Sequence, residues 1–212
     1  MDRQEIPEAK SRTRHAVARS LTGLTPSRRR AASVAVAQRL AGLPAVRQAR
    51  TLMVFLSLPT EIDTWPIIRW AWHEGKRVVV PRIEPGPPGR VAPIHERPMA
   101  AVVLAPAEVD GVAQHPALRP GPLGILEVPD VPPVPVAEID VVLVPCMAVD
   151  RRGNRLGKGG GFFDRFLSDP ALRAERIVVA FHEQVLDDVP VTECDRAVPV
   201  VVTDSEVLAF NP

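Results

Sequence analysis

Residues 139–145 read IDVVLVP, and residues 146–167 continue with CMAVDRRGNRLGKGGGFFDRFL. The first run is almost entirely apolar and rich in β-branched side chains, which is typical of a strand covered on both faces of a parallel sheet. The second run contains a glycine-rich turn and predicts a short helix over 162–167. A buried strand, a glycine-rich turn and a helix in this order favour an α/β protein.

Further strands and helices are predicted on both sides of this stretch. TLMVFLSL at 51–58 and RVVVPRI at 77–83 read as buried strands. A helix that is capped by Thr64 and runs to Trp72 lies between them, which makes a β-α-β unit with parallel strands. We therefore predict a three-layer α/β/α fold around a mostly parallel central sheet. Later apolar runs predict more of its strands at 176–181, 198–202 and 207–210.

The first 50 residues predict two basic helices. The first spans 8–20 and places Lys10 and Arg14 one turn apart on the same face, and the second ends near Gly42. This arm carries 11 basic and 3 acidic side chains, whereas residues 51–212 carry 15 and 22. Such an arm could bind nucleic acid, a polyanionic small molecule such as a nucleotide, or the acidic remainder of its own fold.

Length and composition favour one domain over residues 1–212. A chain of 212 residues with 46% hydrophobic content can bury a full core, and a formal net charge of +1 identifies no partner. Between Pro81 and Pro135 the chain has 14 prolines in 55 residues. We therefore expect residues 81–137 to form loops draped over this domain, with a short edge strand at 101–104.

The sequence carries no sign of secretion or of a membrane span. The start MDRQEIPEAK lacks an apolar signal region, and no run approaches the ~18 apolar residues of a spanning helix. Cys146 and Cys194 lack a metal-binding spacing, which suits a reducing compartment, so we expect a cytoplasmic protein. Cys146 could be a nucleophile at a strand end or a small buried thiol.

The glycine-rich turn is the first place to look for chemistry, because ligands of open α/β sheets collect beyond the carboxyl ends of strands. Dense glycines let several backbone N–H groups approach a phosphate, and Arg155 and Lys158 supply positive charge beside them. The spacing is neither a Walker loop nor G-x-G-x-x-G. A flexible surface turn would explain the glycines alone, but it explains glycines and cations together poorly. The glycines are Gly153, Gly157, Gly159, Gly160 and Gly161.

The pattern D-x-x-G-N-R-L-G-x-G-G-G-F-F-D-R-F-L over 150–167 closely resembles the signature of 5-formyltetrahydrofolate cyclo-ligases, also called 5,10-methenyltetrahydrofolate synthetases. The resemblance implies the layered α/β fold that these enzymes share with sugar-phosphate isomerases. Other matching pieces occur in the same order over nearly the whole chain. They are Lys10 and Arg14, FLSLPTEIDT at 55–64, GKRVVVP at 75–81, GPLGILE at 121–127, and Glu183, Gln184, Pro190 and Asp195.

The resemblance implies a ligase that uses ATP and Mg²⁺ to convert 5-formyltetrahydrofolate, with or without a polyglutamate tail, to 5,10-methenyltetrahydrofolate, ADP and phosphate. In that reaction the formyl oxygen attacks the γ-phosphorus, nitrogen 10 adds to the resulting iminium phosphate, and phosphate leaves. Catalysis would depend on positioning and charge neutralisation. We expect a monomer or weak homodimer without nucleic-acid or membrane partners.

The resemblance also implies the residues of the site. Arg155 and Lys158 would be catalytic through charge neutralisation, and Asp164 and Asp195 would hold magnesium. The folate would contact Leu58, Glu61, Asp63, Lys158 and Phe162. ATP would contact Lys10, Arg14, Arg155, Leu156, Gly157, Lys158, Gly159, Gly160, Gly161, Phe162 and Phe163.

Several of these residues also have an ordinary structural explanation. Lys10 and Arg14 by themselves read as a solvated helix face, and Asp164 reads as a first-turn acid that stabilises its own helix. Glu61 and Asp63 could likewise place negative charge at the start of the helix that follows them.

Some positions depart from the family pattern. Lys158, Phe162 and Phe163 stand where relatives usually have tyrosine, and Val128 replaces a proline. Phenylalanine keeps the stacking area and loses the hydroxyl group. These departures leave open a paralogue that acts on another N-formyl compound, or a non-catalytic domain that binds a nucleotide or effector. A nucleic-acid binder would show affinity that falls steeply with salt, and the basic arm lacks interleaved aromatic residues.

Overall fold

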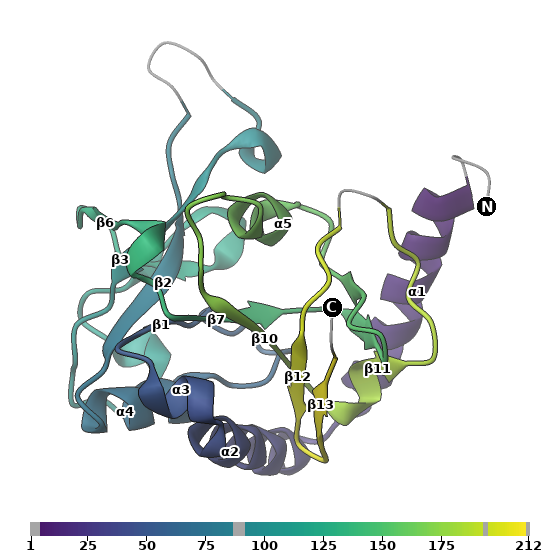
Figure 1. The fold of residues 1–212 in the computed structure, drawn as a ribbon, viewed down its shortest axis with the longest axis horizontal. Coiled ribbons are helices and arrows are strands. Elements are labelled where there is room, and N and C mark those ends of the chain that lie inside the picture. Colours follow the sequence, from purple (N-terminus) through teal and green to yellow (C-terminus); the bar gives the residue numbers. More distant parts are fainter. Residues whose placement is uncertain (1–4, 87–91, 193–194, 211–212) are drawn as a thin grey trace.

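Figure 1 shows the computed structural model of the chain, which describes residues 5–86, 92–192 and 195–210. A central sheet runs through it in the order β13-β12-β10-β7-β1-β2-β3-β6. The strands from β12 to β2 pair in parallel, and β13, β3 and β6 pair antiparallel at the two ends. The bounds are β1 (Thr51–Met53), β2 (Arg77–Ile83), β3 (Met99–Val103), β6 (Pro133–Val134), β7 (Val141–Pro145), β10 (Glu175–Ala180), β12 (Val200–Thr203) and β13 (Val207–Ala209).

Short strands form smaller ladders beside the central sheet. β8 (Ala148–Asp150) pairs with β9 (Arg155–Leu156) and with β11 (Val185–Leu186), and β4 (Arg119–Pro120) pairs with β5 (Leu126–Glu127). Single 3₁₀ turns connect several strands. They are η1 (Ile94–Glu96), η2 (Val112–Gln114), η3 (Pro122–Gly124), η4 (Val136–Glu138) and η5 (His182–Gln184).

Helices cover both faces of the central sheet (Figure 1). Along β7, Val141 and Leu143 pack into the core that α1, α2 and α4 share, whereas Val142 and Val144 pack with the apolar side chains of α5. This alternation between two buried faces confirms the three-layer α/β/α fold around a mostly parallel sheet. The helices are α1 (Glu5–Thr22), α2 (Pro26–Gly42), α3 (Pro44–Gln48), α4 (Trp65–His73) and α5 (Phe162–Leu167). Within the described ranges, none of them combines the length and the apolar character that crossing a bilayer requires.

The direction in which strands are added reverses between β1 and β7. From β1 the chain crosses through α4 to β2 on one side, whereas β7 pairs with the other side of β1 and leads on to β10 and β12. In open α/β sheets the cleft at such a reversal, beyond the carboxyl ends of the two strands, is the usual ligand site. Residues 54–64 and 146–161 follow those two ends, so the fold brings FLSLPTEIDT and the glycine-rich turn together.

Two strands differ from the sequence prediction. The strand expected over 51–58 is limited to β1, and the residues after Met53 continue as a loop toward the site. The short strand expected at 101–104 corresponds to β3, but the prediction that it forms an edge is wrong, because β6 pairs with its outer side. The apolar run could not reveal this partner, since β6 is only a two-residue strand in a proline-rich segment.

Thr64 is the N-cap residue of α4, as predicted, but its side chain does not supply the capping hydrogen bond. The hydroxyl group of Thr64 donates to the backbone carbonyl of Phe55 at 2.7 Å and makes no capping bond. The carboxylate of Asp63 takes that role, because its Oδ1 accepts from the backbone N–H of Trp65 at 2.9 Å. The hydroxyl of Thr64 thus ties the start of α4 to the loop that follows β1.

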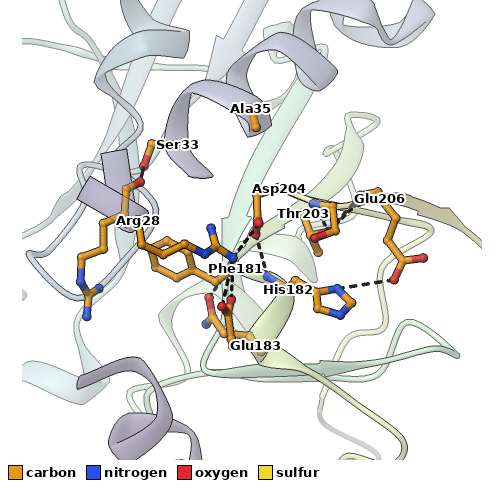
Figure 2. Close-up of polar contacts among 12 residues, drawn as sticks. Arg28, Ser33, Ala35, Phe181, His182, Glu183, Thr203, Asp204 and Glu206 are labelled. Carbon is orange, nitrogen blue, oxygen red and sulfur yellow. Dashed lines mark hydrogen bonds and ion pairs between the residues drawn. The ribbon is translucent and has the colours of Figure 1, made fainter. Parts of the chain in front are cut away.

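Part of the basic N-terminal arm neutralises acidic residues of its own fold. Figure 2 shows Arg28, whose Nη2 donates to Asp204 at 2.8 Å and to Glu183 at 3.0 Å. Asp204 also accepts from the backbone N–H of His182 at 2.9 Å. Burial opposes the positive charge, but the two carboxylates outweigh it and raise the pKa of Arg28. Of the three partners considered for the basic arm, the contacts of Arg28 support the acidic residues of its own fold.

Candidate active site

A cavity of about 420 Å³ opens beyond the carboxyl ends of β1, β2 and β7. Apolar side chains such as Phe55, Leu58 and Met99 make up much of its wall. Residues 157–161, named the glycine loop from here on, form one side together with the start of α5. The cavity therefore combines an apolar surface with a loop of exposed backbone, as a ligand with an aromatic part and an anionic part requires.

A buried aspartate holds the turn that precedes the glycine loop. Asp150 is fully buried, and its Oδ1 accepts from the backbone N–H groups of Arg152 at 2.9 Å and Asn154 at 3.0 Å. Its Oδ2 accepts from the side chain of Asn154 at 2.9 Å and from the backbone N–H of Val189 at 3.3 Å. Burial alone would raise the pKa of Asp150, but these hydrogen bonds lower it overall. The turn is thus fixed by a carboxylate that stays ionised.

Arg155 is buried behind the wall of the cavity. Its Nη1 donates to the backbone carbonyl of Pro145 at 3.3 Å, and its Nη2 forms a close ion pair with Asp164 Oδ1 in α5. Its side chain is only 2% exposed, and its Nε has no hydrogen-bond partner among the described residues. Arg155 therefore links the end of β7 to α5 and adds positive charge to the site from inside the protein.

The glycine loop presents unused backbone donors. The N–H groups of residues 157–161 donate no hydrogen bond to any residue that the structure describes. Arg14 reaches the loop from α1 and donates from Nε to the carbonyl of Gly157 at 2.9 Å. Consecutive free N–H groups beside a guanidinium group form an anion-binding concavity.

Lys10 lies one turn before Arg14 on α1 and forms an ion pair with Asp195 Oδ2. Both side chains are largely buried, with 14% and 17% exposed. Asp195 also accepts from the backbone N–H and the hydroxyl group of Thr192. Burial would raise the pKa of Asp195, but the bonds from Lys10 and Thr192 lower it overall. Lys10 and Arg14 thus reach later segments of the chain, Lys10 at Asp195 and Arg14 at the glycine loop, although neither side chain lines the cavity.

Lys158 of the glycine loop takes part in another ion pair on the cavity wall. Lys158 Nζ lies 2.8 Å from Glu61 Oε1, and Glu61 Oε2 accepts from the backbone N–H of Leu58 at 2.8 Å. Leu58, Glu61, Lys158, Phe162 and Phe163 all line the cavity. The loop after β1 and the glycine loop thus meet through oppositely charged side chains.

The profile of one enzyme family, the 5-formyltetrahydrofolate cyclo-ligases, matches residues 6–204. The chain belongs to this family. The 5-formyltetrahydrofolate cyclo-ligase of Escherichia coli (strain K12) is 34% identical over 185 residues, which cover 87% of this chain and 94% of the relative. That of Mycolicibacterium smegmatis is 29% identical over 197 residues, or 93% and 94% of the two chains. The solved structure of the Aquifex aeolicus 5,10-methenyltetrahydrofolate synthetase superposes with a TM-score of 0.75 at 26% identity, over 96% of this chain and 93% of that one.

Membership in the cyclo-ligase family makes this chain an enzyme of the ligase class, as the resemblance of residues 150–167 implied. Some residues carried over from that resemblance lie away from the cavity surface. Asp63 is exposed and caps α4, and it does not line the cavity. The side chain of Leu156 is 1% exposed and packs into the core, so only its backbone is near the loop.

Asp164 and Asp195 are the two carboxylates that the resemblance implied as magnesium ligands. Asp164 and Asp195 belong to neighbouring segments, because Asp164 Oδ1 also lies 3.5 Å from the backbone nitrogen of Arg196. Asp164 Oδ2 and Asp195 Oδ1 accept no hydrogen bond from the described residues. No group of three or more His, Cys, Asp or Glu side chains in the described ranges could hold a metal ion. Two carboxylates completed by water and phosphate oxygens are a donor set that Mg²⁺ accepts.

Two other residues line the cavity. The sequence left the role of Cys146 undecided and assigned no role to Glu127. Cys146 lines the cavity, and burial raises the pKa of its thiol to about 12, which supports the small buried thiol over the nucleophile. Glu127 also lines the cavity although it is only 8% exposed. The motif GPLGILE contains this glutamate, so the signal was present in the sequence without a chemical role attached to it.

Proposed function

We propose that this chain converts 5-formyltetrahydrofolate and ATP to 5,10-methenyltetrahydrofolate, ADP and phosphate, with Mg²⁺ as the metal. The observation that carries the proposal is the glycine loop. This loop lines the cavity beside an apolar wall, its N–H groups donate to no described residue, and Arg14 contacts it from α1. The names of the relatives supply the folate substrate, and the cavity supplies the place where a folate and a triphosphate could meet.

The triphosphate would lie along the glycine loop, between α1 and α5. Backbone N–H groups would donate to phosphate oxygens, with Arg14 and Lys10 adding charge from α1. Arg155 would neutralise charge from its buried position, and Lys158 would add positive charge from within the glycine loop itself. The side chains of Phe162 and Phe163 would flank the loop and exclude water.

Magnesium would be held by Asp164 and Asp195. When bound, the ion supplies charge neutralisation on the transferred phosphoryl group. Arg155 pairs with Asp164, and Lys10 pairs with Asp195, where its hydrogen bond helps to lower the pKa of that carboxyl group. Ionised carboxylates are the form that coordinates the metal.

The folate would occupy the apolar part of the cavity, with Leu58 and Phe162 against its ring system and Glu61 as an acceptor for its N–H donors. Asp63 would act only indirectly, because it holds the start of α4 behind the loop that carries Glu61.

The chemistry that we propose proceeds through a phosphorylated formyl oxygen. The formyl oxygen attacks the γ-phosphorus and ADP leaves; nitrogen 10 then adds to the formyl carbon and releases its proton to solvent, and the C–O bond breaks as phosphate departs. Phosphorylation turns a poor leaving oxygen into a good one. The protein would therefore contribute mainly position and positive charge, with the cations and loop amides stabilising the charge that develops.

The direct test is turnover of purified protein with 5-formyltetrahydrofolate and MgATP, followed by the near-ultraviolet absorbance of the methenyl product. Arg14→Met removes a charged contact with the phosphate site, so we expect the KM for ATP to rise roughly 10- to 100-fold. Arg12→Met is the matched control, because Arg12 lies on the same helix and contacts only Glu8, at 3.5 Å, among the described residues. Its kinetics should equal those of the unaltered chain.

Three outcomes separate the alternatives. Methenyl formation with the expected Arg14 effect supports the proposal. ADP release with another N-formyl donor, but none with 5-formyltetrahydrofolate, would identify the paralogue. Nucleotide binding without any turnover would identify the non-catalytic binder. We also propose that the enzyme is cytoplasmic and that it acts as a monomer or weak homodimer.

A further inference from the structure

Glu127 is a buried carboxylate that faces the cavity and is only partly satisfied by the protein. Its Oε1 accepts from the backbone N–H of Ile83 at 2.9 Å. Its Oε2 accepts no hydrogen bond from the described residues, yet it is not among the buried side-chain atoms that lack a partner. Glu127 lines the cavity, and its Oε2 keeps an acceptor position that no described residue fills.

The backbone around Glu127 leaves room for this carboxylate. A Cβ atom at Gly121 would lie 2.6 Å from both Cδ and Oε2 of Glu127, closer than any real contact. The N–H of Gly121 bonds to the carbonyl of Ile125 at 2.8 Å, so the turn cannot simply move aside. The motif GPLGILE therefore contains both the acid and the glycine that lets the acid approach the turn.

No cation neutralises Glu127 by direct contact within the described ranges. The nearby Arg82 donates from Nε and Nη2 to Glu84, and from Nη1 to the backbone carbonyls of Val128 and Val131. Burial raises the pKa of Glu127, and the Ile83 N–H and the more distant charge of Arg82 offset this only in part. A ligand with N–H donors would supply what the protein does not.

Glu127 also lies away from the phosphate side of the cavity. Its partner Ile83 ends β2, which is separated from β7 by β1. Adjacent strands are about 4.8 Å apart, so the ends of β2 and β7 are roughly 10 Å apart. A ligand that reaches both the glycine loop and Glu127 must span that distance, as a folate beside a nucleotide phosphate would.

We propose that Glu127 is a specificity-determining residue, whose carboxylate accepts the adjacent N–H donors of the 2-amino-4-oxopyrimidine ring of the folate. This inference rests on the proposed function. Glu61 already accepts from Leu58 and Lys158, so it would accept from another N–H group of the folate and not from both adjacent donors of this ring. Two neighbouring donors on a planar ring match a carboxylate with one oxygen free and the other sharing a single donor.

The test pairs a variant with a ligand that lacks one donor. Calorimetry measures binding of 5-formyltetrahydrofolate and of its 2-desamino analogue to the unaltered chain, to Glu127→Gln and to the control Glu84→Gln. Glu84 is a neighbouring acid that pairs with Arg82 and does not line the cavity. Glu127→Gln keeps an oxygen for the Ile83 N–H but presents an NH₂ group where an acceptor is needed.

We expect the unaltered chain and Glu84→Gln to prefer the parent folate over the analogue by roughly 10- to 100-fold, the range for a hydrogen bond to a charged group. Glu127→Gln should bind the parent that much more weakly and show no preference, while its affinity for MgATP stays the same. Unchanged discrimination in Glu127→Gln would overturn the inference. Glu127→Asp withdraws the carboxylate by one methylene and provides a second variant with the same expected loss, should the glutamine variant fail to fold. If the unaltered chain binds neither folate, the proposed function itself fails.

Discussion

Asp150→Asn is expected to loosen the turn that carries Arg155 without changing the size of the side chain. The carboxylate of Asp150 has no exposed surface and accepts hydrogen bonds at both oxygens. An amide in its place must present NH₂ either to the backbone N–H groups of Arg152 and Asn154, or to the Asn154 side chain and the backbone N–H of Val189. In either orientation the NH₂ group of the asparagine meets other hydrogen-bond donors and cannot accept from them.

The size of the effect follows from these contacts. Whichever oxygen becomes NH₂, at least two buried donors lose their acceptor, and each costs about 1–3 kcal/mol. Taking the lower half of that range gives a loss of about 3 kcal/mol in the free energy of unfolding. For a chain of this length that corresponds to a fall of about 6–12 °C in the melting temperature.

Urea unfolding followed by circular dichroism measures this loss, with Asp188→Asn as the matched control. Asp188 also pairs with Arg152, but its side chain is 66% exposed, so its amide variant should change stability by less than about 0.5 kcal/mol. A loss below about 1 kcal/mol in Asp150→Asn would refute the reasoning, because buried donors would then have found other acceptors at little cost.

The pH dependence provides a second readout of the same carboxylate. Because the folded pKa of Asp150 is lowered, its contribution is fully present above the unfolded pKa of about 3.9. It is lost as the pH falls through the lower folded value. The stability of the unaltered chain should therefore fall more steeply in acid than that of Asp150→Asn, and equal slopes would contradict the assigned shift.

Three further changes test other parts of the structure. Gly153→Ala would place a Cβ 2.3 Å from the backbone carbonyl of Val198 at a φ of +81°, so it should cost at least about 3 kcal/mol by urea unfolding. Gly111→Ala, which meets no atom within 4 Å, should stay within about 0.5 kcal/mol. Arg28→Met removes ion pairs made by a side chain that is 36% exposed, so it should cost about 1 kcal/mol, and less in high salt; an equal loss at every ionic strength would argue against charge pairing. With the other cysteine replaced by alanine, Cys146 should resist iodoacetamide at pH 8 until urea unfolds the chain, and rapid labelling of folded protein would contradict its raised pKa.

Much of the fold could be predicted because short stretches of sequence indicate its strands and helices. The apolar run at 77–83 is β2, the run after Ile139 is β7, and the helix expected at 162–167 is α5. The weaker predictions concerned boundaries and neighbours. The strand after Thr51 stops early, and the side chain of Asp63 rather than that of Thr64 supplies the capping bond of the next helix, because either side chain satisfies the local pattern.

The site was predicted unevenly for the same reason. Gly157 to Gly161 and Arg155 stand out in the sequence, and family resemblance drew attention to Lys10 and Asp195. Neither spacing nor composition could say that Arg155 is buried against Asp164, or that Glu127 enters the same cavity. Those facts depend on which strand ends meet.

The sequence by itself determined the layered α/β character, the glycine-rich loop after β9 and the family of the chain, since each depends on short-range patterns of apolar, glycine and charged residues. Only the tertiary structure decided which charges pair. Lys10 and Asp195 lie 185 positions apart and meet because α1 packs beside the loop that follows η5. The order of strands brings β2, β1 and β7 to one cleft, and burial there selects which acids remain ionised and which keep an oxygen for a ligand. Long-range packing and desolvation leave no periodic signal in a single chain of letters.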